Sequence, residues 1–150
     1  LEHAVSYLSI QNVRFQDKFT FTVDWDEKLA DCLCPKLVIQ PLLENAVYHG
    51  MEGMYEDGEI QLKIYAVNEL VHIDVIDNGE GMTEAQVQKM MQGDVGSSKR
   101  GSGIGVKNVN DRIKLYFGEA YGVQIISAPD EGTTARIYFP MRRQEDEIEK

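Results

Sequence analysis

The chain has 150 residues and a formal net charge of −10 at pH 7, and this length is sufficient for one domain with its own core. Its composition, 43% hydrophobic and 27% charged, is that of an ordinary soluble globular protein. The negative charge argues against nucleic acid or anionic lipid as a partner, and no stretch approaches the roughly 20 apolar residues of a membrane-spanning helix. We expect a cytoplasmic domain from a longer protein, because Leu1 is not a natural initiator.

The first third of the chain predicts a helix, a strand and a second helix. Residues 1–14 place apolar side chains at roughly helical spacing. The segment from Lys18 to Trp25 alternates apolar and polar residues, which is typical of a half-buried strand. A helix from about Pro35 to His49 follows, and Pro41 inside it predicts a kink or a restart because proline lacks an N–H donor.

Two strand pairs and two further helices follow. The expected strands are Glu59–Val67, Leu70–Ile76, Val123–Ala128 and Thr134–Phe139, and the expected helices run from the cap Thr83 to Met91 and from Val106 to Phe117, where Gly118 ends the helix. The glycine-rich stretch from Gln92 to Gly103 predicts a mobile loop. Because tight turns make the strand pairs antiparallel, we expect an α+β two-layer sandwich. Its sheet is mixed and mostly antiparallel, with about three helices on one face.

The first motif is Pro-Leu-Leu-Glu-Asn-Ala-Val-Tyr-His-Gly, which starts at Pro41 on the second helix. Asn45 and His49 are one helical turn apart and share a face. One interpretation is a helix edge where these polar groups meet water. The other is a site in which the Asn45 amide oxygen binds Mg²⁺, an ion that prefers oxygen ligands, while Glu44 activates the nucleophile and His49 approaches phosphates.

The second motif, Asp-Asn-Gly-Glu-Gly-Met from Asp77 to Met82, directly follows an expected strand. A carboxylate at this position can accept a hydrogen bond from the exocyclic amine of adenine. Gly79 and Gly81 leave room for a flat ring against the backbone, and Met82 suits a ring face. The alternative is an ordinary turn between a strand and a helix.

The third motif is the loop Gly101-Ser102-Gly103-Ile104-Gly105, just before the expected helix at Val106. Glycines at a helix N-terminus leave N–H groups free to bind an anion, and Lys99 adds a nearby positive charge. A flexible connector is the alternative interpretation of this loop by itself. It is not a P-loop, because no Gly-Lys-Ser/Thr follows.

In combination and in this order, the three motifs resemble the ATP-binding fold shared by histidine kinases, DNA gyrase, Hsp90 and MutL proteins. Asn45 falls in the N box of that fold, Asp77 to Gly81 in its first glycine box and Gly101 to Gly105 in its second. The resemblance also implies that Thr133 or Thr134 binds near adenine. The implied ATP-binding residues are Asn45, Asp77, Gly79, Gly81, Met82, Lys99, Gly101, Gly103, Ile104, Gly105, Thr133 and Thr134.

The wording of the first motif is similar to that of LytS/YesM-type sensor histidine kinases. This resemblance implies that Mg·ATP is bound, that its γ-phosphoryl group passes to a histidine on an upstream helix, and that a response regulator then receives the group. The acceptor motif of that family is absent here, so the acceptor would lie outside this chain, in a membrane-anchored homodimer. We expect the end of a helical linker at 1–15, the ATP-binding domain at 16–141 and a charged tail at 142–150. The stretch from Gln92 to Ser102 would form a lid.

Two other functions remain open. The first is an ATPase clamp of the gyrase or chaperone kind, in which Glu44 would activate water. The second is a regulatory module that binds nucleotide without catalysis.

Overall fold

The computed structural model describes residues 6, 9–10, 19–29, 38–47, 58–92 and 102–142. Its order of elements is β1 (Phe19–Trp25), a short 3₁₀ turn (Glu27–Leu29), α2 (Ile39–Asn45), β2 (Gly58–Val67), β3 (Leu70–Asp77), α3 (Glu84–Met91), α4 (Ser102–Phe117), β4 (Gly122–Ser127) and β5 (Thr133–Pro140). Within these residues, no helix is both long and apolar enough to cross a membrane.

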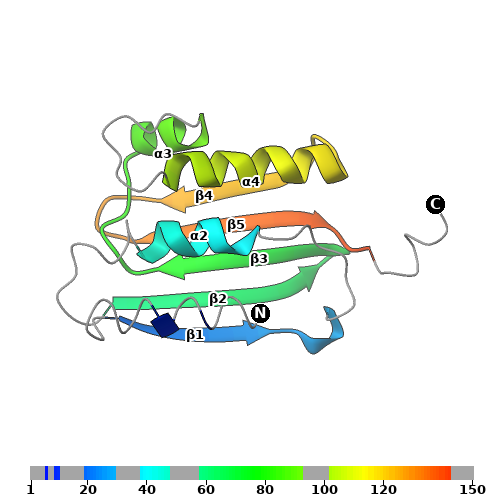
Figure 1. Cartoon of the computed structure of the whole chain (residues 1–150), viewed down its shortest axis with the longest axis horizontal. Helices are drawn as coiled ribbons and strands as arrows, with labels where there is room; N and C mark the ends of the chain where they lie inside the picture. Colours follow the sequence, from blue (N-terminus) through cyan, green and yellow to red (C-terminus); the bar gives the residue numbers. More distant parts are fainter. Residues whose placement is uncertain are drawn as a thin grey trace.

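The five strands form one mixed sheet in the order β1-β2-β3-β5-β4. Only the β1–β2 pair is parallel, and the other three pairs are antiparallel. Helices α2 and α4 lie against one face of the sheet and α3 packs beside α4 (Figure 1). This arrangement confirms the predicted α+β sandwich with a mostly antiparallel sheet and three helices.

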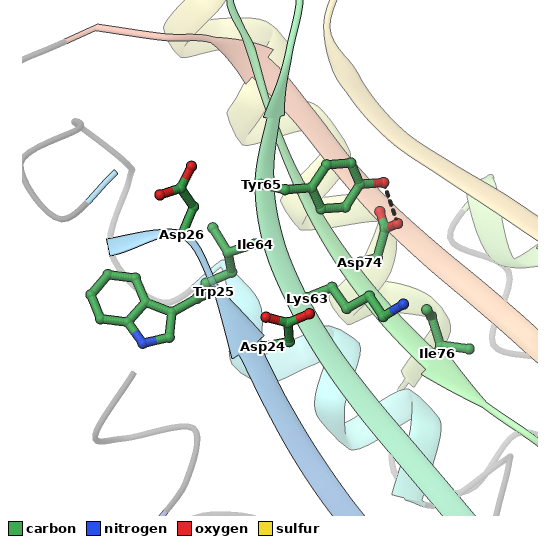
Figure 2. A pocket seen from close by; sticks show the side chains of 8 residues that line it. All are labelled: Asp24, Trp25, Asp26, Lys63, Ile64, Tyr65, Asp74 and Ile76. Carbon is green, nitrogen blue, oxygen red and sulfur yellow. Dashed lines mark hydrogen bonds between the residues drawn. The ribbon is translucent and has the colours of Figure 1, made fainter. Parts of the chain in front are cut away.

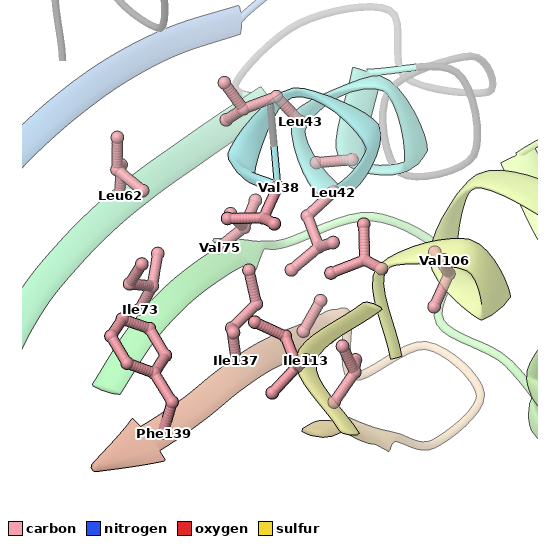
Figure 3. Close-up of a cluster of buried hydrophobic side chains, with 14 of the residues drawn as sticks. Val38, Leu42, Leu43, Leu62, Ile73, Val75, Val106, Ile113, Ile137 and Phe139 are labelled. Atoms are coloured by element: carbon pink, nitrogen blue, oxygen red, sulfur yellow. The ribbon is translucent and has the colours of Figure 1, made fainter. Parts of the chain in front are cut away.

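Alternation of side chains explains why the helices cover this face. Ile73 and Val75 on β3 are buried beneath the helices, as are their β5 neighbours Ile137 and Ala135. The apolar face of α4 meets them through Ile113, which is fully buried (Figure 3). The core therefore lies between the sheet and the helices, and the predicted strand periodicity is confirmed.

Helix α3 begins as its sequence predicts. The Thr83 hydroxyl accepts a hydrogen bond from the Gln86 N–H at 3.2 Å, and the Gln86 side chain accepts one from the Thr83 N–H at 2.8 Å. This reciprocal pair is a capping box, which satisfies two donors at the helix start.

Two expected boundaries differ in the structure. Helix α4 begins at Ser102 and not at Val106, so the predicted loop ends earlier and Gly103 and Gly105 belong to the first turn of the helix. Helix α2 begins at Ile39, which puts Pro41 in the first turn, where the missing N–H would have no partner within the helix. The expected first helix, the expected lid and the charged tail lie almost wholly outside the described residues.

Candidate functional site

The carboxyl group of Asp77 lies at the end of β3 on the face covered by helices, where the residue is only 5% exposed. Its Oδ1 accepts a hydrogen bond from the Gly79 N–H at 2.9 Å. Burial raises the pKa of this carboxyl to about 6, although hydrogen bonds from the Gly79 and Thr133 backbones act in the opposite direction. Two backbone donors are therefore not enough to replace the water lost on burial, and the group is suited to a ligand that supplies a further donor.

The sheet register separates the two candidate threonines. Thr133 is paired with Asp77 across β3 and β5, so the two side chains share the face covered by helices. Thr134 is paired with Ile76 and points to the opposite face. Of the two hydroxyl groups, that of Thr133 is therefore the one on the same face of the sheet as Asp77.

Gly81 is held against the β4–β5 turn in a way that no other residue could adopt without strain. Its φ is +72°, and a Cβ atom built there would lie 2.0 Å from the carbonyl oxygen of Ala128. The same contact between loops includes a hydrogen bond of 2.6 Å from the Asp130 N–H to the Glu80 carbonyl. Gly81 thus fixes the loop after Asp77 against the turn before Thr133.

A residue that the motifs did not identify joins the same two loops. The Ser127 hydroxyl, at the end of β4, accepts a hydrogen bond from the Met82 N–H at 2.8 Å and lies 2.8 Å from the Thr133 hydroxyl. Val123 and Ile125 precede it on the same face of β4. A polar residue at the end of that apolar series was the sequence feature that could have revealed it.

Asn45, the predicted metal ligand, is 2% exposed at the end of α2, and its Oδ1 has no hydrogen-bond partner among the residues that the structure describes. A buried acceptor without a partner destabilises a protein by about 1–3 kcal/mol. An oxygen atom of this kind fits a hard cation such as Mg²⁺. The preceding Glu44 is partly exposed, and its Oε1 accepts a hydrogen bond from the Gln40 side chain at 3.4 Å.

The start of α4 lies against α2. A Cβ atom on Gly105 would approach the Pro41 Cβ to 3.2 Å, so the two helices pack closely there and a larger residue would require a small shift of Pro41. The first turn of α4, residues 102–105, carries backbone N–H groups without partners in the helix. His49, Lys99, Gly101 and the side chain of Ile104 lie outside the part of the chain that the structure describes.

A separate cavity of about 410 Å³ opens away from these motifs. Its lining residues are Asp24, Trp25, Asp26, Lys63, Ile64, Tyr65, Asp74 and Ile76 (Figure 2). None of them belongs to the predicted ATP site. Asp74, one of these lining residues, is 3% exposed. Its carboxyl accepts hydrogen bonds from Arg136 at 2.8 Å and from the Tyr65 hydroxyl at 2.6 Å, so Asp74 and Arg136 form a structural ion pair.

His72, like Asp74 and Tyr65, lies on the face of the sheet opposite the helices, which is its open face. Its ring centroid is 5.2 Å from that of Tyr65, and burial followed by the charge of Arg136 lowers its pKa. The His72 side chain therefore packs against an aromatic neighbour.

Comparison with known proteins identifies the family of this chain. The family model of histidine kinase-, DNA gyrase B- and HSP90-like ATPases matches residues 31–143. Sensor histidine kinase YesM of Bacillus subtilis (strain 168) is 38% identical over 138 residues, which are 92% of this chain and 22% of YesM. Sensor protein LytS of Bacillus anthracis is 31% identical over 147 residues, 98% of this chain and 25% of LytS. The chain thus spans about a quarter of these relatives.

Solved structures show the same fold. The mycobacterial sensor histidine kinase MprB superposes with a TM-score of 0.64 at 20% identity, and the match covers 95% of each chain. The catalytic domain of histidine kinase ThkA gives a TM-score of 0.67 at 16% identity over 93% of this chain and 90% of the ThkA chain. Because the family model matches most of the sequence, this chain belongs to the family of histidine kinase-, DNA gyrase B- and HSP90-like ATPases.

Proposed function

We propose that this chain is the catalytic ATP-binding domain of a sensor histidine kinase. The observation that carries the proposal is the buried carboxyl of Asp77, which shares one face of the sheet with Thr133 and whose partners among the described residues are backbone donors. A buried carboxylate accepts hydrogen bonds and therefore favours the binding of a ligand that donates one. The exocyclic amine of adenine is such a donor. The relatives named sensor histidine kinases favour a kinase over an ATPase clamp.

The remaining site residues have roles that follow from their positions. Gly81 keeps the loop after Asp77 tight against the β4–β5 turn, and Met82, which is partly buried against the core, would contact the face of the base. The N–H groups of residues 102–105 at the start of α4 would bind phosphate oxygens, since the positive end of the helix dipole lies there.

Asn45 would hold Mg²⁺ through its unpartnered Oδ1. The ion would neutralise charge on the phosphates when it is bound. Glu44, adjacent to Asn45 and partly exposed, would activate the acceptor histidine of a helix outside this chain. The chain spans about a quarter of its relatives. We further propose that the acceptor helix and a membrane anchor lie in the rest of the protein, and that the full-length protein is a homodimer. A response regulator would then receive the phosphoryl group.

The decisive experiment is a titration with a fluorescent ATP analogue, with and without Mg²⁺, beside the variant Asp77→Asn. We expect saturable binding that ATP competes and GTP does not, and loss of binding in the variant. Equal binding by the variant would overturn the assignment of Asp77.

Phosphoryl transfer is tested separately, by adding the phosphoacceptor region of the full-length protein to the ATP-loaded domain. Transfer of the γ-phosphoryl group to a histidine, and its loss in Glu44→Gln, is expected. Tight binding without transfer would favour the non-catalytic regulatory module, and ATP hydrolysis without transfer would favour the ATPase clamp.

A further inference from the structure

We propose that Ser127 is a positioning residue for base selection, because it fixes the Thr133 hydroxyl as a hydrogen-bond acceptor toward the bound base. The inference rests on the proposed ATP-binding function and extends it. Among the described residues, the Ser127 hydroxyl has three neighbours within hydrogen-bond distance: the Met82 N–H, the Gly132 carbonyl and the Thr133 hydroxyl.

The direction of each hydrogen bond follows from the inventory of donors. A hydroxyl has one proton to donate and two lone pairs that accept. The Gly132 carbonyl can only accept, so at 2.9 Å it takes the Ser127 proton. The Met82 N–H can only donate, so at 2.8 Å it occupies one lone pair of the Ser127 oxygen. Ser127 therefore has no proton left for the third contact.

The contact between Ser127 and Thr133, at 2.8 Å, must then run in one direction. The Thr133 hydroxyl donates its proton to the remaining lone pair of Ser127. With its only proton used in this way, Thr133 can act toward any other group only as an acceptor. Asp77, its cross-strand neighbour, is also an acceptor when it is ionised.

Two adjacent acceptors select the chemistry of the ligand. An amino group at the six-position of a purine, as in adenine, supplies two N–H donors directly or through a bridging water. Hypoxanthine and guanine carry an oxygen there, which would face Asp77 and Thr133 as a third acceptor. A buried polar group left without its partner weakens binding. Ser127 thus contributes to discrimination without contacting the base itself.

The other reading of Ser127 is purely structural, since it ties the Met82 loop to the β4–β5 turn. This role would lower the affinity for all nucleotides alike. Base selection by contrast predicts a change in the ratio of affinities, because a Thr133 hydroxyl freed from Ser127 can rotate and donate to a six-position oxygen.

The test measures the affinities of ATP and inosine triphosphate by competition in the whole chain and in Ser127→Ala. These nucleotides differ at the six-position of the base, which carries an amino group in ATP and an oxygen in inosine triphosphate, and inosine triphosphate also carries a proton on N1. We expect the preference for ATP to fall about tenfold in Ser127→Ala. Ser127→Thr, which keeps the hydroxyl, should retain the preference. Ser127→Cys, nearly the same size but with a weaker donor and acceptor, should lower it while maintaining the fold.

A double-mutant cycle with Thr133→Val completes the design. Once the Thr133 hydroxyl is removed, Ser127→Ala should change the preference no further. The proposal is overturned if Ser127→Ala or Ser127→Cys, folded as judged by circular dichroism, weakens both nucleotides equally or leaves their ratio unchanged. Failure of the wild-type chain to bind ATP at all would instead refute the ATP-binding function, so the two failures are distinguishable.

Discussion

Asp77→Asn should abolish ATP binding and at the same time stabilise the fold at neutral pH. The Asp77 carboxyl is proposed to bind adenine, but its burial as a charged group lowers the free energy of unfolding. Burial raises the pKa of Asp77 from 3.8 to about 6. The folded protein therefore binds the Asp77 proton more tightly than the unfolded chain does. Between pH 3.8 and about 6 the folded state holds more protons, so the contribution of this group to stability falls as pH rises and stays low above pH 6.

The size of the effect follows from the two pKa values. A difference between 3.8 and about 6 corresponds to about 3 kcal/mol of unfolding free energy lost between low and neutral pH. The neutral amide of Asn does not ionise, so Asp77→Asn should be free of this loss. Its amino group, however, would meet the backbone donors that now serve the carboxylate, which reduces the net gain at neutral pH.

Urea unfolding of the wild type and Asp77→Asn from pH 4 to pH 8 measures the effect. The other carboxyl groups titrate in both proteins, so the difference in unfolding free energy isolates Asp77. We expect this difference to shift by about 2–3 kcal/mol in favour of the variant between pH 4 and pH 8, while the variant loses ATP binding. A difference that does not change with pH would refute the argument that burial raises this pKa.

Three further changes test other parts of the structure. Asn45→Ala should make nucleotide affinity independent of Mg²⁺ and lower the affinity for Mg·ATP about tenfold. Calorimetry with and without the ion measures this, and an unchanged Mg²⁺ dependence would exclude Asn45 as the ligand. Gly81→Ala should lower the unfolding free energy by about 2 kcal/mol or more, since its Cβ would overlap the Ala128 carbonyl. Gly118→Ala, also at positive φ but with open space around it, should lower it less, and equal losses would refute the steric argument. Arg136→Met should destabilise the chain by about 3 kcal/mol, because buried Asp74 loses its ion-pair partner. The ATP affinity of the folded protein should stay the same. A fall in that affinity would show that the open face of the sheet is coupled to the site.

The sequence determined those features that depend on neighbouring residues. Strand alternation, the helix cap at Thr83 and the positions of the hairpins were all predicted, because local periodicity and turn chemistry decide them. Asp77, which directly follows a strand, was also assigned to the sheet end before the structure placed it there. The start of α4 was misplaced by four residues, because glycines at a helix start resemble a loop in sequence.

The tertiary structure decided every feature that joins distant segments. The choice of Thr133 over Thr134 depends on the register between β3 and β5, which no local pattern contains. The close approach at Gly105 arises from its contact with Pro41 on another helix. Likewise, the hydrogen bonds that join Ser127 to two other loops are not contained in its local sequence. Contacts of this kind result from packing across the whole chain, so the sequence could supply the residues of the site but not their pairing.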